Sequence, residues 1–390
     1  MMNVKHVKYS KVSTSNEFST SSSTNKKYLE FWALVAMLFS ALFFSCMNVF
    51  VKLVGDKNVP ATQLVSIRAI GQGFVILLGL YFVRDDTMAR VGSIEMKRLI
   101  FTPFGGTRDV VRVVVLRGVL GGMGFVSYFY TVNALPIGDA ITLMSLFPIV
   151  SIFLGRIFLS EPIVVLHLFA ALGCIVGATL IARPPFLFGE VEQDKNVEID
   201  QMGYLTAGLG TIFGGCVFVL MRKAGTLGVH TLQLLFSWAV FGLLFAAILG
   251  NTTNFESDDW VSPKRFDRST WLELLGLLGF GILAHFLMNW AGTLAPAGLG
   301  AIFRSSDIVY AYFFEIVVFS VTPRLTTYIG VVFVILSVFS VGYHRWRSSK
   351  SNNDGGHDER EDMEDEEDLV VVTVELNSLT HDDGDTTENI

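Results

Sequence analysis

The sequence predicts an all-α integral membrane protein of ten transmembrane helices, built as two inverted repeats of five helices each. Three observations support this prediction: ten apolar stretches of membrane-spanning length, a second half that repeats residues of the first, and a composition too apolar for an ordinary soluble domain. Of the 390 residues, 51% are hydrophobic and 17% are charged, and the mean hydropathy is +0.51.

Each apolar stretch is close to the roughly 20 residues with which an α-helix crosses about 30 Å of hydrocarbon. Helices are expected because a backbone amide in lipid has no water to bond, so each span must satisfy its own hydrogen bonds. The predicted spans of the first half are 31–51, 60–83, 112–132, 139–159 and 161–182. Those of the second half are 202–221, 229–250, 271–293, 298–320 and 324–343.

The second half repeats the first at fixed spacings. At an offset of 170, the matching pairs are Cys46/Cys216, Val49/Val219, Gly55/Gly225, Val59/Val229, Gln63/Gln233 and Leu64/Leu234. At an offset of 160, they are Gly121/Gly281, Pro136/Pro296, Gly138/Gly298, Ser145/Ser305, Phe153/Phe313 and Ser160/Ser320. These matches indicate duplication. Because five spans is an odd number, the two copies are expected to insert in opposite senses, with a site near the midplane between them.

Polar segments flank and separate the repeats. We expect a disordered tail over 1–30, the first repeat over 31–183, an acidic linker over 184–201, the second repeat over 202–344 and a disordered acidic tail over 345–390. Lys and Arg residues are more frequent in the tails and in the loops on their side of the membrane. The positive-inside rule therefore predicts cytoplasmic termini for a multi-pass protein of the plasma membrane or an endomembrane.

One stretch resembles a known family. Residues 133–148 read NALPIGDAITLMSLFP, and 156–162 read RIFLSEP. This pattern is similar to the end of an EamA domain, where a short loop, a span of small residues with a proline and a loop glutamate precede the fifth helix. The second half departs from it, with Val321 and Thr322 where the first half has Glu161 and Pro162.

The tandem repeat resembles the drug/metabolite transporter superfamily, and the long tails are most similar to those of solute carrier family 35, G subfamily. The resemblance covers about residues 31–344 and leaves both tails out. It implies a transporter.

Polar residues within the spans are the candidate site, because a mid-span charge costs about 2.5 to 3.5 kcal/mol and usually faces a cavity or a partner. These residues are Arg68, Arg117, His285, Asn289, Arg304, Asp307 and Glu315. Their counterparts at the fixed offsets are Trp238, Leu277, Phe125, Phe129, Met144, Phe147 and Gly155. Since the polar residues are not repeated, we expect them to serve a substrate rather than the shared scaffold.

Arg68 is the predicted principal contact, because it lies deep in its span without a nearby acid on the same helix, and a guanidinium suits a carboxylate or phosphate. Arg304, Asp307 and Glu315 can line one stripe of the ninth span, while the alternative for the first two is an ion pair that only neutralises itself. Arg117 either contacts substrate or extends to the membrane surface.

His285 and Asn289 are four residues apart and share a face of the eighth span. For His285 a hydrogen-bonded packing role is the alternative to a proton relay. If an ion gradient drives transport, Glu315, Asp307 and His285 are the predicted proton carriers.

The predicted function is secondary active transport of a small organic anion or related metabolite by alternating access. The alternatives are a nucleotide-sugar antiporter of the endomembrane system and a transport-inactive membrane scaffold. We predict neither an enzyme nor a cofactor or metal site, because Cys46, Cys174 and Cys216 all lie in apolar spans and the known hydrolase motifs are not found. The predicted partners are the substrate and the bilayer, without nucleic acid.

Glycine pairs in three spans permit close approach of helices: Gly118/Gly122, Gly173/Gly177 and Gly210/Gly214. Packing within one chain is one interpretation. A homodimer through Gly173 is the other.

Overall fold

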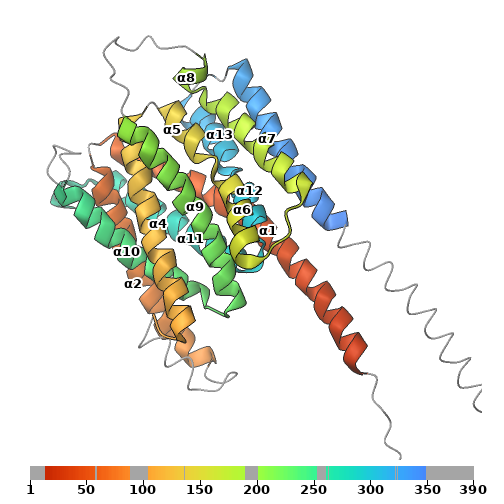
Figure 1. Ribbon diagram of the computed structural model, residues 1–390. Helices are drawn as coiled ribbons and strands as arrows, with labels where there is room; N and C mark the ends of the chain where they lie inside the picture. Colours follow the sequence, from red (N-terminus) through yellow and green to blue (C-terminus); the bar gives the residue numbers. More distant parts are fainter. Residues whose placement is uncertain are drawn as a thin grey trace, which may run out of the picture. The chain divides into compact units, whose positions relative to one another are not determined.

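The computed structural model in Figure 1 describes residues 14–57, 59–87, 104–135, 137–188, 201–252, 261, 263–320, 322 and 324–347. The chain divides into two units, Leu29–Gly342 and a second one made of Met1–Tyr28 and Tyr343–Ile390. Within the second unit the described residues are helical. The unit Leu29–Gly342 contains the helix bundle.

The described residues of this unit contain helices and connections and no β-strand, as predicted. The helices of the first repeat are α1 (Thr14–Gly55), α2 (Ala61–Thr87), α4 (Arg108–Ala134), α5 (Ile137–Met144), α6 (Phe147–Leu159) and α7 (Val165–Ala182), and the short α8 (Pro185–Phe188) follows. Those of the second are α9 (Gln201–Thr226), α10 (Thr231–Thr252), α11 (Arg268–Leu294), α12 (Ala297–Arg304), α13 (Asp307–Phe319) and the helix Leu325–Arg347, with a 3₁₀ turn at Pro263–Arg265.

Nine stretches of the described chain are long and apolar enough to cross a membrane. The predicted ninth span, 298–320, is different because it is divided into α12 and α13, which are interrupted at Ser305 and Ser306. The predicted fourth span is interrupted at the equivalent place, at Ser145 and Leu146 between α5 and α6. The expectation that Arg304 and Asp307 share one continuous helix is therefore wrong: they stand on either side of the interruption.

Equivalent residues of the two repeats make equivalent contacts. Gln63, at the start of α2, exchanges two hydrogen bonds with the backbone of Val261, which precedes α11. Its counterpart Gln233, at the start of α10, donates to the carbonyl of Gly105, which precedes α4. Each repeat thus holds the loop before the third helix of the other repeat, as a two-fold relation between inverted halves requires.

The interface between the repeats is formed mainly by helices with small residues. Helix α4 packs against α9 and α10, and α10 also packs against α2. Gly118 and Gly122 face Ser237, Phe241 and Phe245 of α10, at positions where a Cβ would collide. A glycine is needed there because the helices approach too closely for any side chain.

Gly173 and Gly177, on α7, pack within the chain. A Cβ on Gly173 would collide with Ser337, and one on Gly177 would lie 2.7 Å from the carbonyl oxygen of Gly330. These contacts are packing within one chain, which is one of the two interpretations given for the glycine pairs from the sequence. The predicted homodimer through Gly173 stays a prediction.

Candidate functional site

The interruption between α12 and α13 carries an ion pair. A guanidinium nitrogen of Arg304 lies 2.5 Å from a carboxylate oxygen of Asp307. Arg304 is in the last turn of α12 and Asp307 in the first turn of α13. Each charge therefore complements the dipole of its own helix end, negative at an N-terminus and positive at a C-terminus. Ser45 of α1 donates a hydrogen bond to the Asp307 carbonyl at 3.0 Å.

Two arginines share an aromatic ring beside this pair. The guanidinium carbon of Arg304 lies 4.5 Å from the ring centroid of Phe44, and that of Arg68 lies 5.6 Å from the same ring. Arg68 also lies 4.6 Å from the ring of Trp238. The aromatic faces stabilise the two cations without neutralising them, because a ring carries a quadrupole and no net charge.

A buried hydrogen-bond network adjoins Arg68. Arg117 donates through Nη2 to Nε2 of His285 and to Oδ1 of Asn289, both at 3.2 Å. Nδ1 of His285 lies 3.3 Å from Oε1 of Gln72, and the amide nitrogen of Gln72 donates to the carbonyl of Leu235 at 3.1 Å. The His285 ring contacts Trp238 edge-on with centroids 4.8 Å apart, which joins the network to Arg68.

The network determines the tautomer of His285. A guanidinium has only donors, so Nε2 must accept from Arg117. The Gln72 amide nitrogen is committed to Leu235, so its oxygen faces the histidine and Nδ1 must donate. His285 is therefore neutral, with both ring nitrogens occupied. This geometry supports the packing role over a proton relay in this conformation.

The site has positive charge and unused donors. Among the described side chains of the mid-span candidates, three arginines accompany one carboxylate, Asp307. Arg117 is 1% exposed and Arg68 is 8% exposed. In the described part of the chain, Nε of Arg68 and both Nε and Nη1 of Arg117 are buried without a hydrogen-bond partner. An anionic oxygen would satisfy such donors, which burial has already separated from water.

The structure brings six of the seven predicted residues together: Arg68, Arg117, His285, Asn289, Arg304 and Asp307. Glu315 belongs to α13, but its side chain lies outside the described ones. Arg117 is fully inside the bundle, which excludes extension to the membrane surface in this conformation. Phe44, Gln72 and Trp238 also belong to the site and were not predicted from the sequence. Of these three, only Gln72 could have been identified, because it is a polar residue in an apolar span, four positions after Arg68.

Comparison with known proteins agrees with this architecture. The model of the EamA-like transporter family matches residues 31–183 and 201–343. The chain belongs to the EamA-like transporter family. The protein is thus a multi-pass membrane transporter.

The EamA-like chain has curated relatives that it matches over most of their length. It is 27% identical to solute carrier family 35 member G1 of Mus musculus over 79% of this chain and 77% of that protein. It is 25% identical to the pseudopaline exporter CntI of Pseudomonas aeruginosa over 79% of this chain and 94% of the exporter. Both relatives are named as transport proteins, in agreement with the expectation that the protein is not an enzyme.

A solved structure has the same fold as this EamA-like transporter. It is a crystal structure that superposes with a TM-score of 0.57 at 17% sequence identity. The match covers 78% of this chain and 95% of the other chain.

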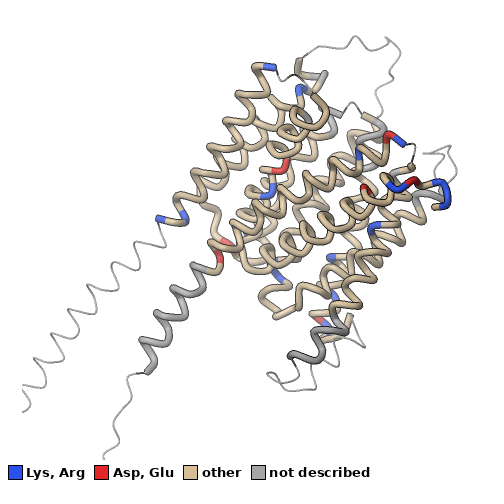
Figure 2. The backbone as a smooth tube through the Cα atoms, turned by 180° about the vertical axis from the view of Figure 1, so that it is seen from behind, with Lys and Arg blue, Asp and Glu red and all other residues tan. Residues whose placement is uncertain are grey.

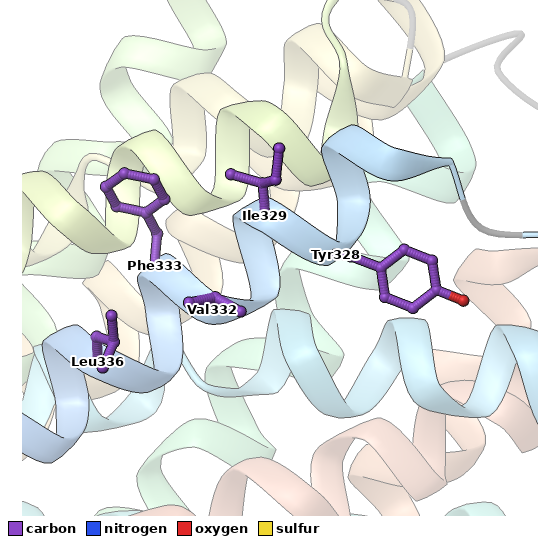
Figure 3. Close-up of a pocket in the computed structure, with 5 residues that line it drawn as sticks. All are labelled: Tyr328, Ile329, Val332, Phe333 and Leu336. Carbon is purple, nitrogen blue, oxygen red and sulfur yellow. The ribbon is translucent and has the colours of Figure 1, made fainter.

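A hollow of about 260 Å³ on this EamA-like transporter is separate from the charged site. Tyr328, Ile329, Val332, Phe333 and Leu336 line it, and all five lie along the helix Leu325–Arg347 (Figure 3). All five are exposed, and each is aliphatic or aromatic. Such a surface suits lipid chains.

Figure 2 shows most charged positions near helix ends and few along the middles, as a bilayer requires.

Proposed function

We propose that the protein is a secondary active transporter of a small organic anion or related metabolite, working by alternating access between its two repeats. The observation that carries this proposal is the charge of the site. Arg68 and Arg117 are buried with donors unused among the described residues, and the partly buried Arg304 pairs with Asp307, the one carboxylate described there. An uncompensated cation in a bilayer interior is costly unless an anion or water approaches it. A transported anion supplies the compensation.

In this mechanism Arg68 and Arg304 hold the anionic group against Phe44. Asp307 pairs with Arg304 in the absence of substrate, and the carboxylate or phosphate of an incoming substrate competes with Asp307 for the guanidinium. The interruption in the ninth span places two helix ends at the site, as discontinuous helices do in other carriers. The Arg117 network positions Trp238 and, through it, Arg68.

We further propose that both termini are cytoplasmic, on the distribution of Lys and Arg. Coupling to protons, where it occurs, is assigned to Asp307 and Glu315, with His285 as a third candidate in another conformation. The match to solute carrier family 35 member G1 supports the transport of a solute. A nucleotide-sugar antiporter is the second candidate, on kinship within the same carrier family.

Uptake into proteoliposomes tests the proposal. The probes are radiolabelled lactate, succinate, glucose 6-phosphate and UDP-glucose, the last of which tests the nucleotide-sugar alternative. We expect Arg68→Ala to lower uptake of the accumulated anion at least about tenfold, because one lost charge-assisted hydrogen bond is worth about 1.5 to 3 kcal/mol. Arg112→Ala is the matched control, since this arginine is exposed and pairs only with nearby Asp109 among described residues.

Accumulation of UDP-glucose alone would replace the organic-anion assignment with the nucleotide-sugar one. Accumulation of none of the four probes, or equal uptake by wild type and Arg68→Ala, would favour the transport-inactive scaffold.

A further inference from the structure

Four helix ends from the two repeats meet at one membrane face, away from the central site. Glu161 follows α6 in the first repeat, Arg222 lies near the end of α9, and Thr293–Ala297 join α11 to α12 in the second repeat. A carboxylate oxygen of Glu161 lies 3.3 Å from Nε of Arg222. The other accepts a hydrogen bond from the backbone nitrogen of Ala297 at 3.0 Å.

Arg222 completes the connection by donating to the last carbonyls of α11. Its Nη1 lies 2.5 Å from the carbonyl oxygen of Leu294 and 3.3 Å from that of Thr293. One carboxylate and one guanidinium therefore satisfy the exposed backbone groups of both helix ends, a donor at the start of α12 and acceptors at the end of α11. Without Glu161 the Ala297 amide loses its acceptor, and without Arg222 the carbonyls of Thr293 and Leu294 lose a donor.

The backbones at this face approach closely. A Cβ on Gly155 of α6 would lie 3.7 Å from the Cβ of Ala297 and 3.1 Å from Glu161. Within the second repeat, a Cβ on Gly225 of α9 would collide with the backbone of Thr293. Gly155 and Ala297 thus let the two repeats touch directly beside the Glu161–Arg222 pair, and this face of the interface is closed.

The equivalent position on the opposite face lacks the acid. The counterpart of Arg222 is Lys52, whose ammonium lies 4.1 Å from the ring centroid of Phe319. The counterpart of Glu161 is Val321 in the sequence. A cation over a ring at a wet surface contributes about 0.5 to 1 kcal/mol, less than a partly buried ion pair with three further hydrogen bonds. The scaffold therefore needs no carboxylate there, and Glu161 is an addition to one face.

We propose that Glu161 and Arg222 form a gate between the repeats, closed in this structure, whose opening exposes the central site to that side of the membrane. The proposal rests on the proposed alternating-access function and assigns its closing contact. Opening separates the end of α6 from the start of α12, so the carboxylate leaves both Arg222 and the Ala297 amide and becomes hydrated. Glu161 and Arg222 are positioning residues, since neither touches the central site.

The charges around Glu161 give the gate a dependence on pH. Burial raises the pKa of the Glu161 carboxyl, the Ala297 amide and Arg222 of α9 act against burial, and Glu30 of α1 adds a repulsive negative charge. Opening hydrates the carboxyl and returns its pKa toward the ordinary value. The closed gate therefore binds a proton more tightly than the open gate, and lower pH favours closure.

A reversible cross-link tests the gate. In Gly155→Cys/Ala297→Cys the two Cβ atoms are 3.7 Å apart, within the range of about 3.5 to 4.5 Å for a disulfide. We expect oxidation to form the disulfide, to lower uptake of the accumulated probe anion at least about tenfold and to be reversed by reduction. Each single-cysteine variant, carrying the same native cysteines, is the control. Continued uptake by the oxidised double variant, or failure of the disulfide to form, would overturn the gate.

Hydrogen exchange gives a readout that needs no substrate. In the full chain in nanodiscs, oxidation of the double variant should slow amide exchange of 294–304 relative to the reduced form. If no probe anion is transported but exchange slows, the gate stands and the proposed substrate class fails. If Arg68→Ala loses uptake while oxidation changes neither uptake nor exchange, the proposed function stands and the gate fails.

Charge variants provide a second test that does not require cysteines. Glu161→Gln keeps an acceptor for the Ala297 amide but cannot pair ionically with Arg222. In wild type we expect the amides of 294–304 to exchange more slowly at pH 5 than at pH 7, after correction for intrinsic exchange. Glu161→Gln should abolish this gain in protection. Asp109→Asn, which removes an exposed carboxylate, should behave as wild type. Wild-type pH dependence of this protection in Glu161→Gln would reject the gate.

Discussion

The fourth and ninth spans show the same interruption with different chemistry. Both are divided near the middle, at Ser145 and Leu146 in one and at Ser305 and Ser306 in the other. Met144 and Phe147 flank the first interruption, whereas Arg304 and Asp307 flank the second and pair at 2.5 Å. An interrupted helix therefore does not require an ion pair at the break. The interruption belongs to the duplicated scaffold, and the charges were added to one copy.

The buried network shows the same distribution across the repeats. Arg117 belongs to the first repeat and its partners His285 and Asn289 to the second. Their counterparts, Leu277, Phe125 and Phe129, are all apolar. The packing between repeats places two unlike sets of side chains at equivalent positions, so one set is polar and the other is aromatic or aliphatic. A symmetric fold thereby contains an asymmetric site.

The largest expected effect comes from making the ninth span resemble the fourth. Arg304→Met replaces the guanidinium with the residue of the other repeat and leaves Asp307 without its cation. We expect uptake of the accumulated anion to fall at least about tenfold, because substrate loses a charge-assisted bond of about 1.5 to 3 kcal/mol. Proteoliposome uptake measures this. Met144→Leu, at the equivalent position, should keep uptake within about twofold.

A double variant separates binding from self-neutralisation. Arg304→Met/Asp307→Asn removes both charges, so no unpaired carboxylate is left at the interruption. If the pair only neutralises itself, the double variant transports as wild type does and Arg304 has no part in binding. Uptake as low as in Arg304→Met would instead confirm Arg304 as a substrate contact.

The helical architecture and most of the candidate site could be predicted from the sequence. Both follow from the free-energy cost of placing a polar group in the bilayer, which each residue carries wherever the chain folds. A polar residue in an apolar span is visible wherever it stands, and Arg68, Arg117 and Asp307 are identified in this way. The interruption at Ser305 was not predicted, although the four consecutive polar residues 304–307 mark it, because the apolar stretches on either side add up to the length of one span. The partner of Arg117 is 168 residues away in the chain, and the ring faces that hold Arg68 depend on how helices rotate in the bundle.

A smaller effect is expected in the buried network. Asn289→Ala removes an acceptor of Arg117, so more of a buried guanidinium is left unpaired. We expect the free energy of unfolding to fall by about 1 to 3 kcal/mol, the usual cost of an unsatisfied buried polar group. Thermal unfolding in detergent measures it. Thr179→Ala, which removes a hydroxyl that donates to the carbonyl of Ile175 on its own helix, should cost less than about 0.5 kcal/mol. Equal losses would mean that Arg117 does not depend on Asn289.

The smallest effect concerns the starts of α2 and α10, which occupy equivalent places. His230 precedes α10, and its Nδ1 accepts from the amide of Leu232 at 3.2 Å while its own amide donates to the side chain of Gln233. These are reciprocal caps of the first turn. The counterpart before α2 is Pro60, which has neither a ring nitrogen nor an amide hydrogen to contribute.

This difference predicts that the cap before α10 makes the stability of the protein depend on pH, whereas the equivalent position before α2 does not. Desolvation of the ring lowers the pKa of His230 below its ordinary value of 6.5, although part of the residue is exposed. The folded state therefore binds a proton less readily than the unfolded state, and the cap's stabilisation is present above pH 6.5 and decreases as the pH falls through that value. The cap contributes at most about 1 kcal/mol. His230→Asn keeps an acceptor that does not titrate, so its unfolding temperature should fall less than that of wild type between pH 7 and pH 5. An equal decrease in both proteins would show that the ring nitrogen does not cap α10 in solution.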